Sequence, residues 1–147
     1  MPSTRTSGPD PDEIATWITT TYPETVVTTA LNAWFFSLDP SSWPNFATIV
    51  TTDEHDMGTP SNLARPGVFR LNIGVGRASF ERLVGSVAEP DHVALDRVLP
   101  HPVYAKQRWI CILNPSRPTF DDLVKPLIAE AHDRLARQRD RASVPNP

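Results

Sequence analysis

Residues 99–135 read LPHPVYAKQRWICILNPSRPTFDDLVKPLIAEAHDRL, and this stretch decides the fold. Its segment 107–113 is dense in aromatic and β-branched side chains, which is typical of a buried strand. Residues 114–118 have the composition of a turn. Apolar side chains then recur at helical spacing; they are Phe120, Leu123, Val124, Leu127, Ile128, Ala131 and Leu135. The stretch therefore predicts a buried strand that leads through a turn into a long helix.

Pro126 interrupts the helical pattern, which begins at Thr119. Proline lacks a backbone N–H and its ring crowds the preceding turn, so it removes a hydrogen bond from a helix. We therefore expect the final helix to kink near Pro126 or to divide into an entry turn and a main segment.

The chain before this stretch predicts one helix and then a series of strands. Asp10 can cap a helix with Pro11 at its first position, and Tyr22-Pro23 ends that helix. β-prone runs follow, the first two forming a hairpin; they are residues 25–30, 34–38, 46–52 and 68–75. Apolar and polar side chains alternate most clearly in the last of these runs. A short helix stopped by Gly85 comes next.

These elements predict an α+β fold. Strands that are joined by short loops, without a crossover helix, must be mainly antiparallel. The economical arrangement is a two-layer sandwich in which the N-terminal and C-terminal helices cover one face of the sheet and the other face is partly open. We expect a single domain over residues 10–141, with a disordered tail at 1–9 and a frayed tail at 142–147.

Composition narrows the class of protein. A chain of 147 residues has the usual size of one domain. Its only cysteine, Cys111, lies in an apolar run, which indicates a buried thiol in a reducing compartment. No apolar run approaches the roughly 18 residues of a membrane helix, so we expect a soluble, cytoplasmic protein with no membrane partner. The 17 acidic residues exceed the 14 basic ones, which disfavours a general nucleic-acid binder.

Four sequence segments, followed by an amphipathic C-terminal helix, resemble those of a known family. They are FATI (46–49), RPGVFRLNIGV (65–75), LPHPVYA (99–105) and WICILNPS (109–116). Over about residues 12–139 the chain resembles an actinomycete family known only as a domain of unknown function. It is more distantly similar to the MmcQ/YjbR-like proteins, although HPVYAKQR stands where those often carry a lysine-rich segment. The distant resemblance implies a helix, an antiparallel sheet and further helices, a fold sometimes likened to DNA-binding or chaperone-like modules. It transfers no catalytic residue.

His101 is the candidate catalytic residue. Because it precedes Pro102, its backbone is biased to an extended conformation where the chain enters the sheet. It could act as a general base or donate to a ligand beside Tyr104, with Asp96 as the nearest candidate to orient it. The alternative is a histidine that is only hydrogen-bonded at a sheet edge.

A second group of candidates belongs to the predicted open face. Arg70 and Asn72 point away from the apolar face of their strand, and further side chains are expected to border the same face; these are Trp34, Phe36, Tyr104 and Arg108. An arginine with aromatic neighbours can receive an anionic or planar ligand, or a partner protein. The predicted ligand-binding residues are Arg70, Asn72, His101, Tyr104 and Arg108. The alternative is that Arg70 is an ordinary solvent-facing residue, or that a loop covers this face.

Two other motifs favour ordinary structural roles. Asp53-Glu54-His55-Asp56 contains possible metal ligands, but adjacent residues rarely point at one ion, so we predict no metal site. Residues 74–79, GVGRAS, follow a strand and open a helix. They lack the last glycine of a dinucleotide fingerprint and the lysine of a phosphate loop, so turn and cap chemistry explain them and no cofactor is predicted.

Three functions remain open. The first is a non-enzymatic module that binds a small molecule or a partner protein through the open sheet face, the loop 53–65 and the segment 101–104. The second is an enzyme or drug-handling protein acting on a small molecule, with His101 as acid or base and Arg70 as an anion clamp. The third, which the net charge disfavours, is nucleic-acid binding through the arginine-rich final helix. The sequence does not decide whether the protein is an enzyme.

Overall fold

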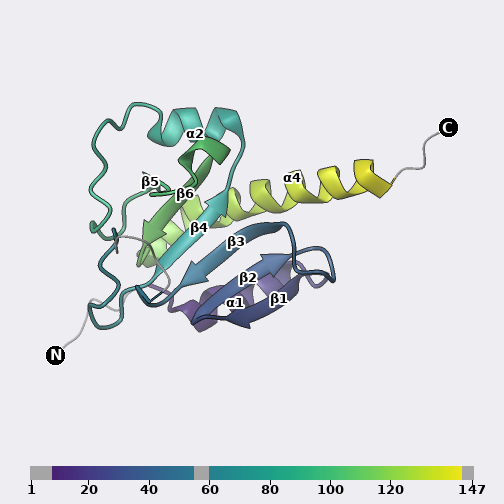
Figure 1. Cartoon of the computed structure of the whole chain (residues 1–147), viewed down its shortest axis with the longest axis horizontal. Coiled ribbons are helices and arrows are strands. Elements are labelled where there is room, and N and C mark those ends of the chain that lie inside the picture. Colours follow the sequence, from purple (N-terminus) through teal and green to yellow (C-terminus); the bar gives the residue numbers. More distant parts are fainter. Residues whose placement is uncertain (1–7, 55–59, 144–147) are drawn as a thin grey trace.

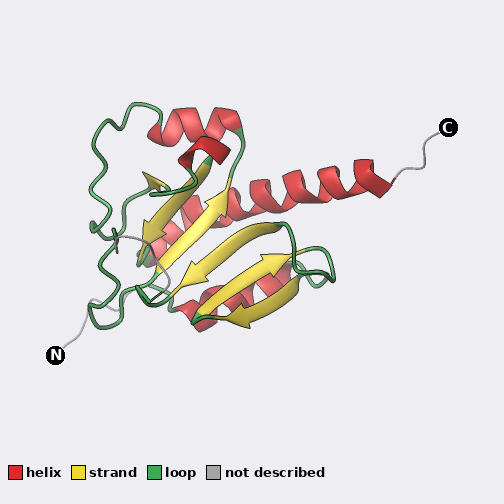
Figure 2. Ribbon diagram, in the orientation of Figure 1, coloured by secondary structure: helices red, strands yellow, loops and turns green. Residues whose placement is uncertain are grey.

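The strands form one antiparallel sheet in the part of the chain that the computed structural model describes, residues 8–54 and 60–143 with side chains up to 140. Their order across the sheet is β1-β2-β3-β4-β6-β5 (Figures 1 and 2). The strands are β1 (Val26–Ala30), β2 (Ala33–Ser37), β3 (Asn45–Val50), β4 (Arg70–Gly74), β5 (Leu99–Pro100) and β6 (Trp109–Leu113). The predicted α+β fold with a mainly antiparallel sheet is confirmed.

Helices form the second layer. The longer ones are α1 (Pro11–Thr21), α2 (Arg77–Val84) and α4 (Lys125–Ser143); the short elements are α3 (Arg117–Thr119), the π-helical turn η3 (Phe120–Val124) and the 3-10 turn η2 (Ala105–Gln107). Figure 1 shows α1 and α4 on the same side of the sheet, as expected for the N-terminal and C-terminal helices. α1 begins where the sequence predicts, because Asp10 caps it by accepting the N–H of Glu13.

The register of the strands assigns each side chain to a face, since successive side chains point to opposite sides of a sheet. Leu71 of β4 pairs with Ile49 of β3 and with Ile112 of β6, and all three are buried on the side of the helices. They share one hydrophobic cluster with side chains from both helices; these include Ile14 and Ile18 of α1 and Leu127, Ile128 and Leu135 of α4. The main core therefore lies between the sheet and these two helices.

The final helix divides at the place that Pro126 predicts. In η3 the N–H of Lys125 donates to the carbonyl of Phe120, five residues back, which makes a wider turn than an α-helix has. This turn ends just before Pro126, which has no N–H to continue the ladder. The helix consequently consists of an entry segment over residues 117–124 and the main helix α4, and the predicted division is confirmed.

The prediction of a partly open second face is wrong at Arg70 and Asn72. Both side chains point away from the helices as expected, yet they are only 3% and 2% exposed. Leu63 and Val68 from the connection between β3 and β4 pack with Leu113 in a second apolar cluster on this side. The connection therefore covers this part of the sheet.

Trp34 and Phe36 do not border Arg70, so that prediction is also wrong. Their register partners, Ile49 and Ala47, face the helices, and both aromatic side chains pack against the main core. A strand assignment from sequence fixes which residues share a face but not which of the two faces each strand turns inward.

Glu130 fastens α4 to the start of α2. Its Oε2 accepts the N–H of Gly76 at 2.7 Å, and its Oε1 accepts the hydroxyl of Ser79 at 2.6 Å. The carboxylate thus caps a helix N-terminus from another element, where the helix dipole also favours negative charge.

We expect Glu130→Ala to lower the free energy of unfolding by about 1–2 kcal/mol, because two donors lose their acceptor and a cap is removed. Urea denaturation measures the change. Glu130→Gln keeps one acceptor, so its free energy of unfolding should lie between those of the unaltered protein and Glu130→Ala. Glu89→Ala removes a carboxylate from an exposed loop and serves as the control; an equal loss in this control would contradict the capping role.

Candidate functional site

A buried polar network occupies the second face of the sheet. Nε of Arg70 donates to Oδ1 of Asn72 at 3.0 Å, and Nη1 of Arg70 donates to Oγ of Ser61 at 3.1 Å. Asn72 in turn donates from Nδ2 to Oγ1 of Thr48 at 2.9 Å, its register partner on β3. Since buried polar groups must find partners, this network joins three segments, namely β3, β4 and the connection that carries Ser61.

His101 lies on the same face, just after the short edge strand β5. Its backbone N–H donates to the carbonyl of Trp109 at 2.9 Å, which extends the pairing of β5 with β6 by one residue. The ring is buried, and its Nδ1 accepts the backbone N–H groups of Val103 and Tyr104 at 3.0 Å each. Because Nδ1 is an acceptor, the neutral ring carries its proton on Nε2. His101 therefore holds the turn over residues 101–104.

The surroundings of His101 keep its ring neutral. Its pKa is lowered from 6.5 to about 3, mainly by burial, and electrostatic interactions with Arg70 and then His92 contribute in the same direction. With Nδ1 engaged by two backbone donors, this ring has no free lone pair with which to act as a general base. The contacts instead match the alternative of a histidine hydrogen-bonded at a sheet edge.

The other predicted site residues have mixed positions. Arg70, Asn72 and His101 are brought to one face of the sheet. Tyr104 is about half exposed, and its ring lies 5.0 Å from that of His101. Arg108, in a left-handed conformation, ends the turn η2 next to it. That these five residues bind a ligand stays a prediction.

Asp96 has a different partner from the one expected. Its Oδ1 accepts the N–H of Ser116 at 2.8 Å, so this carboxylate holds the turn before α3.

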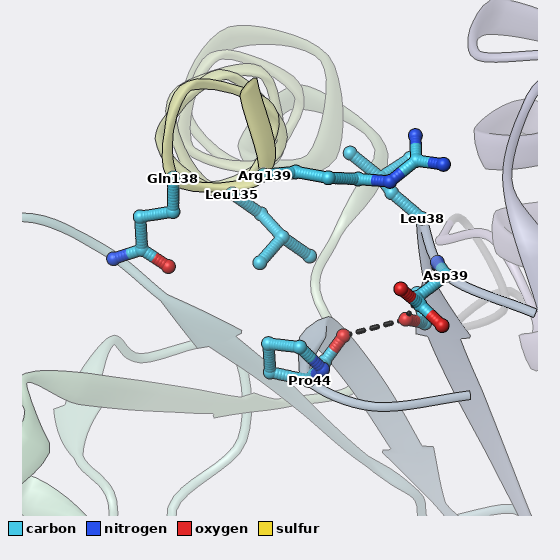
Figure 3. Close-up of a pocket in the computed structure, with 7 residues that line it drawn as sticks. Leu38, Asp39, Pro44, Leu135, Gln138 and Arg139 are labelled. Atoms are coloured by element: carbon cyan, nitrogen blue, oxygen red, sulfur yellow. Dashed lines mark hydrogen bonds between the residues drawn. The ribbon is translucent and has the colours of Figure 1, made fainter. Parts of the chain in front are cut away.

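A cleft of about 240 Å³ lies between α4 and the connection between β2 and β3. The residues that line it are Ser37, Leu38, Asp39 and Pro44 from the sheet side and Leu135, Gln138 and Arg139 from α4. Figure 3 shows Leu135 pointing toward Pro44, with Gln138 and Arg139 on either side. The hydroxyl of Ser37 donates to the carbonyl of Pro44 at 2.6 Å and fixes the lower wall.

The opening of the cleft carries charges of both signs. Hydrogen bonds from Ser41 hold the pKa of Asp39 below its usual value, and the positive charge of Arg139 acts in the same direction. Asp39 is therefore ionised at neutral pH. Arg139 also lowers the pKa of Glu24, although the larger causes there are a backbone hydrogen bond and the hydrogen bond with His132.

His132 forms a cluster with two aromatic rings and a hydrogen-bonded carboxylate one turn before Leu135 on α4. Its ring stacks on Tyr22 with 4.1 Å between centroids, and Phe46 meets the ring edge-on at 5.5 Å. Nε2 of His132 lies 2.6 Å from Oε2 of Glu24. The cluster joins the end of α1 to α4 beside the cleft, because Leu135 lies on the same buried stripe of the helix.

Sequence reasoning missed the cleft and the His132 cluster. Leu135 belonged to the predicted helical stripe, but Asp39 and Arg139 are far apart in the chain, and no local pattern brings them together. The one available signal was His132 itself, a polar residue beside Ala131 and Leu135 on an otherwise apolar stripe.

Where the predicted acidic cluster is described, its carboxylates accept hydrogen bonds from neighbouring segments. Oδ1 of Asp53 accepts the N–H of Leu63 at 2.9 Å, and Oε1 of Glu54 accepts from Asn32. His55 and Asp56 lie outside the described residues. Over residues 8–54 and 60–143, no helix is long and apolar enough to cross a membrane.

Comparison with known protein families identifies a match. A model of a family of unknown function, DUF6194, matches residues 9–144 and so covers nearly the whole chain. No curated protein matches the sequence, and no solved structure matches the fold.

The low pKa of His101 predicts an acid-sensitive fold. The folded state favours the neutral ring, so this contribution to stability is fully present above the unfolded pKa of 6.5 and is lost as pH falls toward 3. We expect the free energy of unfolding to fall by up to about 1.4 kcal/mol per pH unit within that window. Urea denaturation at a series of pH values measures this slope.

His101→Asn separates titration from turn formation, because an asparagine oxygen can accept the same two N–H groups without binding a proton. This variant should keep most of the stability at pH 7 and show a flatter slope below pH 6.5. His101→Leu should lose stability at every pH. A slope in His101→Asn as steep as in the unaltered protein would refute the assignment.

Proposed function

This chain belongs to the DUF6194 family, a family of unknown function, and we propose that it is a small-molecule-binding module whose ligand occupies the cleft between α4 and the β2–β3 connection. The observation that carries the proposal is the cleft itself, with an apolar interior and two opposite charges, Asp39 and Arg139, at its opening. Binding sites for small molecules are commonly concave and apolar with a few placed polar groups.

The lining suggests the class of ligand. Leu38, Leu135 and Pro44 offer apolar contact, while Gln138 and Arg139 are exposed donors. The volume of about 240 Å³ is slightly below the usual range for drug-sized ligands, so it suits a compact molecule of fragment size. With a carboxylate and a guanidinium at one opening, the best complement is a small zwitterion with an apolar body, since each of its charges can lie near one of opposite sign.

The two alternatives from the sequence receive less support. An enzyme with His101 as general base conflicts with the two backbone donors on Nδ1. Nucleic-acid binding through the final helix would use its arginines, but Arg134 lies beside Gly76 at the start of α2 and Arg139 lies at the cleft. These two side chains thus serve different neighbours and do not form one basic surface.

Four probes that share a benzyl group test the proposal: phenylalanine, phenylacetate, phenethylamine and benzyl alcohol. Backbone NMR titrations at millimolar concentration should shift the resonances of Leu38, Asp39 and Leu135. We expect phenylalanine to bind most tightly and benzyl alcohol most weakly, because only the zwitterion is complementary to both charges. If no probe shifts these resonances, the cleft is not a binding site for molecules of this class.

Variants on α4 supply the matched comparison. Arg139→Ala should weaken phenylacetate binding roughly threefold to fivefold, because an exposed ionic contact contributes up to about 1 kcal/mol. Gln138→Trp should weaken all four probes by filling the opening. Arg137→Ala removes an exposed arginine of the same helix that does not line the cleft, and it should leave every affinity unchanged.

A further inference from the structure

We infer that the outer edge of β1, which pairs with no strand among the described residues, is a docking surface for a second copy of this chain, and that two copies join their sheets by antiparallel pairing of β1 with β1. This inference is independent of the ligand cleft, because it rests on the backbone of a strand that does not line the cleft. The proposed partner is an extended and uncharged strand, β1 of the second copy.

The hairpin geometry determines which backbone groups face outward. Leu31 and Asn32 have φ angles of 55° and 61°, the values of a two-residue type I′ turn, and Ala30 pairs with Ala33 across it. In such a hairpin the pair that flanks the turn is hydrogen-bonded, and bonded and non-bonded pairs then alternate. Thr28 and Val26 therefore bond to β2, whereas Val27 and Thr29 direct their N–H and C=O groups to the outer edge.

β1 lacks the features that keep an edge strand from pairing. Proteins usually protect such edges with charged residues, proline or a bulge. The strand reads VVTTA, without charge or proline, and its pairing with β2 is regular over all five residues. β5, at the opposite edge of the described sheet, has only two residues and ends in the turn held by His101.

Exposed apolar side chains flank this edge. Val27 on β1 is 39% exposed, Leu31 in its turn 61%, and Trp43 in the β2–β3 connection 71%. The β2–β3 connection passes close to β1, because Ser42, the residue before Trp43, is hydrogen-bonded through its hydroxyl to that of Thr28 at 2.5 Å. A strand added to β1 would cover apolar surface as well as pair with backbone groups, as in other cases of strand addition.

A second copy fits this edge by symmetry. If Thr28 of one copy lies opposite Thr28 of the other, Val27 of each copy faces Thr29 of the other, and both outward-facing residues of each strand are paired. This register places a two-fold axis at Thr28, and two-fold interfaces are the commonest in homo-oligomers. The absence of charge in β1 means that two identical edges do not repel one another.

Sedimentation velocity over a micromolar concentration series tests the dimer. We expect the mass to rise with concentration from 16.3 kDa toward twice that value. Thr28→Lys and Thr28→Glu should each weaken self-association at least about tenfold, because like charges then meet at the two-fold axis. An equimolar mixture of the two variants should recover association as a heterodimer, which an unfolded variant could not do.

Two further variants complete the design. Thr29→Pro removes an outward N–H without breaking a bond to β2, and it should also abolish the dimer while the circular dichroism spectrum is kept. Thr20→Lys adds the same charge on the exposed side of α1 and should leave association unchanged. A wild-type protein that stays at the monomer mass throughout, or charged variants that fail to associate on mixing, would overturn the inference.

Discussion

The register of the central strand β4 is the constraint on which the rest of the structure depends. It places Leu71 beside Ile49 and Ile112 on the side of the helices. It also places Arg70 and Asn72 on the opposite side, where the β3–β4 connection covers them. A shift of one residue would place the guanidinium of Arg70 in the apolar core and move the side chains of Leu71 and Ile73 to the polar side. Because both faces of β4 are buried, the apolar side chains on one face must pack together and the polar groups on the other must be hydrogen-bonded.

The buried polar groups on the second face of the sheet are hydrogen-bonded to one another. Thr48, Asn72, Arg70 and Ser61 form a continuous network that joins the sheet to the loop above it. The same covered environment explains His101, whose ring is desolvated and lies within the field of Arg70. Arg70, Asn72 and His101, which the sequence places in a candidate binding site, thus also hold a covered sheet face together.

The proposed ligand site lies at one end of the sheet face that the helices cover. Pro126 and the wide turn before it set the start of α4, and this helix runs on past the sheet (Figure 1). Where it passes the β2–β3 connection, the two elements form the walls of the cleft rather than a closed core. His132 and Glu24 fix the helix just before that point. The proposed ligand site and the proposed docking edge at β1 lie on the two sides of the same connection, whose Ser42 contacts Thr28 and whose Pro44 lines the cleft.

The sequence by itself determined the local elements: the cap at Asp10, the hairpin, the buried strand 109–113 and the division of the last helix before Pro126. Each of these depends on interactions over a few residues, which periodicity and turn chemistry report directly. The tertiary structure alone decided that Arg70 is buried, that Phe36 faces the helices, that His101 holds a turn, and that Asp39 meets Arg139. These outcomes depend on contacts between segments far apart in the chain. Their geometry is set by strand register and by which loop covers which face, and no local pattern of residues encodes either one.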